Sequence, residues 1–149
     1  MTAVTAHLLA SDERGRILLL RTAADHGRWQ LPGGRAEPGE SPAAAAEREA
    51  GEETGLDLPA RDLLVVAWIP GRPGRSDRLA LLFSTRTLVA ADLAAVRLQE
   101  CEVDAWRLTA PDAGGGLVHP LLAERIAAVT THGPGRYLEQ SAERGPVAS

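Results

Sequence analysis

The amino-acid sequence predicts one α/β domain in which a mixed β-sheet is covered by helices on both faces. The chain has 149 residues, which suits a single domain with a substantial core. Short apolar runs typical of strands outnumber the helical segments. The helical segments also lie in separate parts of the chain, so each is expected to cover a different part of the sheet.

Apolar runs bounded by turn residues predict strands over residues 4–9, 17–20, 29–31, 63–69, 78–86 and 102–108. The first two runs are joined by a short polar turn, and we expect them to pair as a hairpin. The third run stops at Pro32-Gly33-Gly34, and a loop rich in Gly, Pro and charge is expected to reach Glu40.

Residues 42–53 carry the clearest helix signal in the chain. Ser41 is a favourable N-cap, and Pro42 suits the first helical position because its missing N–H would be unpaired there anyway. Gly55 suits the left-handed conformation that ends many helices. A second helix is expected over 118–131, where apolar residues recur at helical spacing. We expect one domain over residues 1–138 and a mobile tail over 139–149.

Composition excludes several classes of protein. Asp and Glu total 20 and Lys and Arg total 16, a net charge of -4, which argues against a nucleic-acid partner. The sequence contains no apolar run of ~20 residues that would span a membrane. Met1 to Ala10 lacks a secretory signal, and the single cysteine, Cys101, has no partner for an internal disulfide. A cytoplasmic protein without a membrane partner is therefore expected.

The first predicted helix concentrates acidic residues on one side. Glu49, Glu52 and Glu53 share a sector of ~100° on a helical projection, and Arg48 lies beside Glu52. Three converging carboxylates repel one another, and a hard divalent cation such as Mg²⁺ relieves that repulsion. The turn at Gly33 can bring a backbone carbonyl toward the same ion. The alternative is a solvated acidic face with Glu–Arg pairs.

These residues also form a longer pattern: Gly34, five residues, Glu40, seven residues, then Arg48 to Leu56. This pattern resembles the Nudix box, Gly-x5-Glu-x7-Arg-Glu-U-x-Glu-Glu-x-Gly-U, in which U is a bulky aliphatic residue. The one departure is Ala50, which is smaller than the usual aliphatic residue. The preceding segment, from Trp29 to Gly34, also resembles the family's entry to the box.

The resemblance implies an α/β/α sandwich and hydrolysis of a nucleoside diphosphate linked to a moiety X, with Mg²⁺ or Mn²⁺. Carried over by position, Glu49, Glu52 and Glu53 would be metal ligands, with the Gly33 carbonyl as an additional ligand. Glu40 and Arg48 match the pair that braces the loop and orients the catalytic glutamates. Gly34 and Gly55 match positions that set backbone shape.

Three glutamates are candidates for the general base. Water is expected to attack one phosphorus of the diphosphate, and Glu53 is our first choice as the base that takes its proton. Glu100 and Glu102 are alternatives outside the box. They also alternate along the chain as residues on a solvated strand edge do.

Substrate-binding residues are less well marked by the sequence. Arg28, Arg72 and Arg78 lie in or beside loops and are candidates to hold phosphates, although a solvated loop explains them equally well. Trp68 is a candidate to stack on a base, although a tryptophan on a strand is more often part of the core.

The box reports diphosphate chemistry and leaves X open. The small size resembles MutT-type enzymes, so we expect a (d)NTP to be hydrolysed to an NMP and pyrophosphate. ADP-ribose or another nucleotide sugar is second, because Pro70 lies near the position of a proline typical of ADP-ribose pyrophosphatases. A prenyl or other non-nucleotide diphosphate is a further alternative. A regulatory module that senses a nucleotide is the non-enzymatic alternative. Either a monomer or a homodimer is compatible with the sequence.

Overall fold

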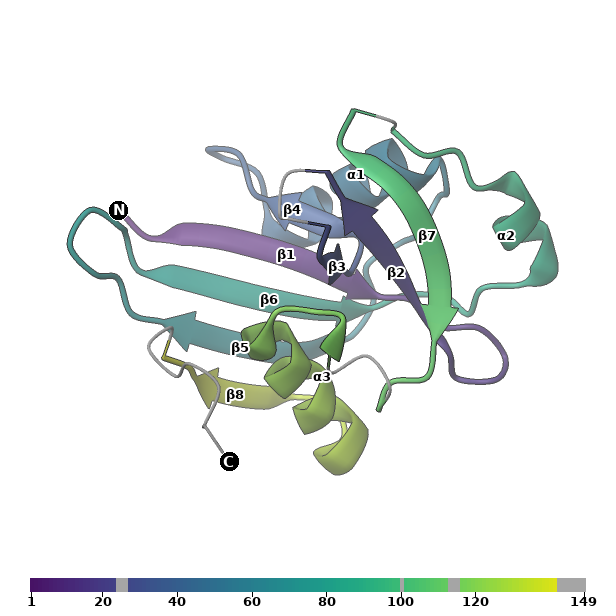
Figure 1. The fold of residues 1–149 in the computed structure, drawn as a ribbon. Coiled ribbons are helices and arrows are strands. Elements are labelled where there is room, and N and C mark those ends of the chain that lie inside the picture. The colour runs from purple at the N-terminus through teal and green to yellow at the C-terminus, as the bar shows by residue number, and fades with distance from the viewer. Residues whose placement is uncertain (24–26, 100, 113–115, 142–149) are drawn as a thin grey trace.

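A computed structural model describes residues 1–23, 27–99, 101–112 and 116–141 (Figure 1). The strands are β1 (Ala3–Leu9), β2 (Ile17–Thr22), β3 (Trp29–Gln30), β4 (Gly33–Arg35), β5 (Leu63–Ile69), β6 (Arg78–Ser84), β7 (Val103–Thr109) and β8 (Arg136–Glu139). The helices are α1 (Pro42–Thr54), α2 (Ala90–Ala95) and α3 (Pro120–His132). Within the described residues, no helix is both long and apolar enough to cross a membrane.

The strands form two sheets. The larger sheet has five strands in the order β4-β1-β6-β5-β8, and it is mixed because β1 pairs parallel to β6 and β5 parallel to β8. The smaller sheet has three antiparallel strands in the order β3-β2-β7.

The expected hairpin between the first two strands is wrong. β1 belongs to the larger sheet and β2 to the smaller one, and they meet only near their connecting turn, where the Leu18 N–H donates to the Ala10 carbonyl at 2.9 Å. The physical reason is that β4 and β6 occupy both edges of β1. No edge of β1 is left for a ladder with β2.

Helices α1 and α3 cover opposite faces of the larger sheet (Figure 1). Ala80 and Leu82 of β6 pack in one core with residues of α3, whereas Leu81 of the same strand packs against the core that contains Ala46 and Ala50 of α1. Side chains alternate across a strand, so β6 serves both cores. The predicted mixed sheet with helices on both faces is confirmed.

Three elements were not expected from the sequence: β4, α2 and β8. The strand expected to reach Arg86 ends at Ser84, because the ladder with β1 ends at the pair Leu9–Ser84 and the ladder with β5 at Leu63–Phe83. The described chain also continues past the expected domain boundary at residue 138. Glu139 is the last residue of β8 and Gln140 is buried, while residues 142–149 of the expected tail lie outside the described residues.

Candidate active site

Local sequence fixes where α1 begins and ends. The Ser41 hydroxyl accepts a hydrogen bond from the Ala44 N–H at 3.1 Å, as an N-cap does. Gly55 has φ 73° and donates its N–H to the Gly51 carbonyl at 2.8 Å, which ends the helix. Ala50, the small residue of the box, is completely buried where α1 packs on the sheet. The last two turns therefore lie beside β4.

Glu53 is the most enclosed of the acidic residues on α1. Its side chain accepts a hydrogen bond from the Gly33 N–H at 2.9 Å, and only 4% of the residue is exposed. The pKa of Glu53 is raised to about 8, chiefly by burial and further by the negative charges of Glu49, Glu102 and Glu52, while the Gly33 hydrogen bond opposes the rise. The carboxyl group is thus poised to exchange a proton near neutral pH.

Glu49 packs directly against the second glycine of β4. A Cβ atom on Gly34 would lie 2.8 Å from the Glu49 carboxyl carbon, so any other residue there would displace the Glu49 carboxylate. Burial raises the pKa of Glu49, and the Arg48 guanidinium opposes that rise. Glu52 is more open, with 47% of its side chain exposed.

Arg48 links the glutamates of α1 to the loop before the helix through hydrogen bonds. Its Nε and Nη2 atoms donate to the two carboxylate oxygens of Glu40 at 2.7 and 2.9 Å, a bidentate pair. Its Nη1 reaches Glu49 at 3.2 Å and Glu52 at 3.4 Å. The hydrogen bond from Arg48 lowers the pKa of Glu40 to about 2, so Glu40 stays ionised. The loop and helix are therefore tied together through one guanidinium.

Glu102 approaches this group from another part of the chain. Its charge raises the pKa of both Glu49 and Glu53, which places it within electrostatic reach of them. The segment before it is attached to the end of α1, because the Arg97 N–H donates to the Thr54 carbonyl at 2.8 Å. Glu100, the other alternative base, lies outside the described residues.

The chemistry of these residues suits a hard divalent cation. All the side-chain donors are carboxylate oxygens, which Mg²⁺ and Mn²⁺ prefer, and the mutual repulsion of Glu49, Glu52, Glu53 and Glu102 is what a bound cation would relieve. In the described part of the chain, their side chains are not drawn together into a formed coordination shell.

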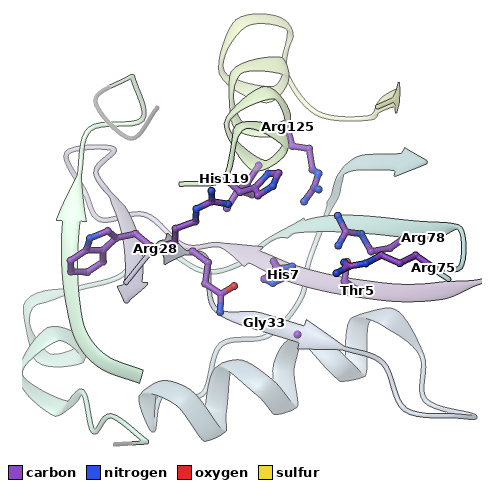
Figure 2. Close-up of a pocket in the computed structure, with 12 residues that line it drawn as sticks. Thr5, His7, Arg28, Gly33, Arg75, Arg78, His119 and Arg125 are labelled. Atoms are coloured by element: carbon purple, nitrogen blue, oxygen red, sulfur yellow. The ribbon is translucent and has the colours of Figure 1, made fainter. Parts of the chain in front are cut away.

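A cavity of about 490 Å³ lies next to the acidic group and is strongly basic (Figure 2). It is lined by Thr5, His7, Arg28, Trp29, Gln30, Gly33, Gly34, Arg75, Arg78, His119, Leu122 and Arg125. Gly33 and Gly34 connect it to the glutamates, since they contact Glu53 and Glu49. Arg125 extends from α3 toward β1, with His7 on the strand below it (Figure 2).

A second cavity of about 470 Å³ continues from the first and shares Arg75, Arg78 and His119 with it. It is lined by the loop between β5 and β6, including Pro70 and Arg72. No acidic residue among those described lines either cavity. The basic character is therefore continuous across both.

The structure places three of the four substrate-binding candidates predicted from the sequence at the cavities. It brings Arg28 and Arg78 to the first cavity and Arg72 to the second. Trp68 lines neither cavity, because neighbouring residues of β5 point to the face covered by α3 and Trp68 alternates to the other.

Sequence reasoning missed His7, His119 and Arg125 as cavity residues. His119 also caps α3, because its side chain accepts a hydrogen bond from the Leu121 N–H at 3.1 Å. Arg125 lies inside the α3 helical pattern, where an arginine normally points to solvent, so no local signal marks it.

Comparison with known proteins identifies the family of the chain. The NUDIX domain model matches residues 1–130, and the chain belongs to the Nudix family. The resemblance to the Nudix box is therefore confirmed at the level of the family.

Solved structures share the fold. A MutT protein from Methanosarcina mazei Go1 superposes with a TM-score of 0.73 at 23% identity, over 87% of this chain and 93% of that one. An ADP-ribose pyrophosphatase from Streptococcus suis 89-1591 gives 0.61 at 18% identity, over 93% and 98%. These identities establish the fold and leave the substrate open.

Curated relatives match a shorter stretch. A CMP-5'-(N-acetyl-N-hydroxy-3-aminopropyl)phosphonate hydrolase from Streptomyces rubellomurinus is 47% identical over 53 residues, which are 34% of this chain and 26% of that protein. Matched segments span from 14% to 32% of the length of the relatives found.

Proposed function

We propose that this enzyme hydrolyses a nucleoside diphosphate linked to X in the presence of Mg²⁺, with a (d)NTP as the favoured substrate and an NMP and pyrophosphate as products. Mn²⁺ is the alternative cation. The observation that carries the proposal is the buried Glu53 carboxyl group, bonded to the Gly33 N–H at the point where the acidic residues meet the basic cavity.

Each residue of the box has a proposed role. Glu49, Glu52 and Glu53, with the Gly33 carbonyl, would hold the cation; Glu40 and Arg48 orient them, and Gly34 and Gly55 set the backbone. Mg²⁺ bound there would offset the charge of the diphosphate and lower the pKa of an attacking water. Glu53 takes the proton from that water as it attacks phosphorus, with Glu102 as the alternative base.

The basic cavity supports an anionic substrate. The whole chain carries a net charge of -4, and a nucleoside triphosphate is also strongly negative, so local positive charge is required for binding. Arg28 and Arg78 are proposed to contact the phosphates in the first cavity, and Arg72 lies at the second.

A nucleotide sugar such as ADP-ribose is the second candidate. Pro70, the residue that pointed to this class, lines the second cavity, which continues from the first and provides additional space. The solved ADP-ribose pyrophosphatase with the same fold is compatible with this candidate.

The test is a panel of nucleotides assayed for phosphate release with added pyrophosphatase, with and without Mg²⁺, on wild type and Glu53→Gln. We expect Mg²⁺-dependent hydrolysis, and a loss of kcat by a factor of roughly 10² to 10⁴ in the variant, because a positioned base contributes about that much. The amide oxygen can still accept from Gly33, so the fold should persist.

Glu47→Gln is the matched control, since Glu47 lies on the same helix but binds the Ala60 N–H away from the site. It should retain wild-type kcat. A Glu53→Gln enzyme with a wild-type rate at saturating Mg²⁺ would remove Glu53 from the role of base, and the same substitution at Glu102 would then be tested.

A further inference from the structure

We propose that the first cavity is a recognition site for a phosphate group of the substrate remote from the bond that is broken, and that Arg78 and Arg125 hold this group. The inference rests on the proposed function, and it deepens it by naming a chemical feature of X. Substrates that end in a neutral group would leave these two guanidinium groups without an anionic partner.

The first observation concerns the carboxylate partners of the arginines. Outside the cavities, Arg16, Arg21, Arg48 and Arg86 are each ion-paired with a carboxylate. The other described arginines outside the cavities form no ion pair, and all of them are exposed to solvent: Arg14, Arg61, Arg97, Arg107 and Arg136. The arginines that line the two cavities are Arg28, Arg35, Arg72, Arg75, Arg78 and Arg125. Within the described ranges, none of these six forms an ion pair with a carboxylate. Positive charge is thus left uncompensated where a ligand would bind.

Among these six described arginines, Arg78 has a buried hydrogen-bond donor without an acceptor. Its Nε atom is buried and has no hydrogen-bond partner in the described structure. A buried donor without a partner costs about 1–3 kcal/mol, and a ligand that supplies an acceptor in the adjoining cavity would remove this cost. The side chain lies at the start of β6, between the two cavities.

Arg125 brings a second positive charge to the same space. Only 7% of the residue is exposed, and its Nε donates to the Gln140 side chain at 2.9 Å, which fixes the direction of the guanidinium. Burial, together with the charge of Arg78, lowers the pKa of Arg125 to about 10. Two guanidinium groups that repel each other in a partly buried cavity are stabilised by an anion placed between them.

The ligand chemistry follows from charge and geometry. Two guanidinium groups offer two positive charges and several N–H donors, which match the charge and oxygens of a phosphate. His7, which faces the same cavity, adds no charge near neutral pH, because burial and the two arginines lower its pKa to about 4. The phosphate can be the end of a polyphosphate chain or a phosphate carried on X, and both present the same group.

The binding test uses inorganic pyrophosphate in EDTA, measured by isothermal titration calorimetry. We expect Arg78→Gln to raise its Kd about tenfold or more, because a charge-assisted hydrogen-bonding partner is lost. Arg78→Lys, which keeps the charge without the planar fork, should recover part of the affinity. Arg61→Gln, on an exposed residue outside both cavities, should bind as wild type does. An unchanged Kd in Arg78→Gln would overturn the proposal.

The kinetic test uses two matched pairs of substrates with Mg²⁺: a nucleoside diphosphate against its triphosphate, and a nucleoside diphosphate sugar against the same compound phosphorylated on the sugar. We expect the added phosphate to raise kcat/KM in one pair, which identifies its source, and Arg78→Gln to abolish that gain. If Arg78→Gln lowered kcat/KM equally for both members of each pair, the assignment would be refuted. If no substrate is hydrolysed at all, the proposed function fails, while the pyrophosphate titration still decides the site.

Discussion

Two carboxyl groups in the same site have pKa values displaced in opposite directions. The hydrogen bonds from Arg48 hold the pKa of Glu40 at about 2, whereas burial raises that of Glu53 to about 8. The difference arises from their surroundings, because Glu40 has a cation beside it, whereas Glu53 is buried and has other carboxylates nearby. Such a separation supports the proposed roles, in which Glu40 stays an anion that orients Arg48 and Glu53 gains and loses a proton.

This separation predicts how stability depends on pH without metal. The pKa of Glu53 is about 8 in the folded chain and ~4.3 when unfolded, so its stabilisation is complete below pH ~4.3 and is lost as pH rises through 8. In EDTA, we expect wild type to lose about 3 kcal/mol of unfolding free energy between pH 6 and 9 from this group. The lowered pKa of His7 acts in a separate, more acidic window.

Urea unfolding of wild type and Glu53→Gln across pH 6–9 measures this effect. The variant should show a flatter profile, and added Mg²⁺ should restore stability to wild type at pH 9 but much less to the variant. Parallel pH profiles for the two proteins would show that Glu53 does not titrate in this range.

Helices and strands that depend on local signals can be predicted from the sequence, whereas those that depend on tertiary contacts cannot. The helix α1 was predicted because its caps, Ser41 and Gly55, act on neighbouring residues. The strand β4 was missed because a glycine pair carries no strand signal, and only contact with β1 makes it a strand. The glutamates of the site follow from the box, which is one continuous segment.

The basic cavity was only partly predictable for the same reason. Arg28 and Arg78 were marked by loops near the sequence motifs, but His7 and Arg125 come from β1 and α3, which only the folded chain brings together. An arginine within a helical pattern looks like a solvent-exposed residue until the packing of the helix is known.

Gly33 is the tightest point between β4 and β1. It has φ 145°, and a Cβ atom there would lie 2.3 Å from the Ala6 carbonyl oxygen. Gly33→Ala would push β4 away and break the hydrogen bond to Glu53, so we expect a loss of about 4 kcal/mol or more of unfolding free energy.

Gly39→Ala is the control for backbone strain alone. Gly39 has φ 80°, and a Cβ atom added there would have no other atom within 4 Å, so this substitution should cost only about 1–2 kcal/mol. Equal losses in urea titrations of the two variants would mean that the close approach of β4 and β1 contributes nothing.

On the scale of the whole molecule, the larger sheet brings opposite charges together from its two faces. The carboxylates come from α1 on one face, and Arg125 comes from α3 on the other. They meet at Gly33 and Gly34, where the edge strand β4 borders the cavity. A diphosphate with an additional phosphate is therefore expected to lie along this edge, with its reacting end at α1.

The position of Arg125 depends on the last described part of the chain. The buried Gln140, directly after β8, accepts from Arg125 and donates from its amide nitrogen to the Leu121 carbonyl and to Glu124, each at 2.9 Å. Its backbone N–H also donates to the Trp68 carbonyl at 2.9 Å. One side chain thus joins α3 to the edge of the sheet.

Gln140→Ala should therefore weaken the attachment of α3. The change leaves the Arg125 Nε without its buried partner, a loss of about 1–3 kcal/mol, which lowers Tm by roughly 3–10 °C in a chain of this size. Tyr137→Phe is the control, because it removes only an exposed hydrogen bond to Glu139 on the same strand and should leave Tm unchanged. Differential scanning calorimetry in EDTA measures both. If the two variants melt together with wild type, the contacts of Gln140 do not hold α3, and Arg125 must be fixed by its packing within the helix.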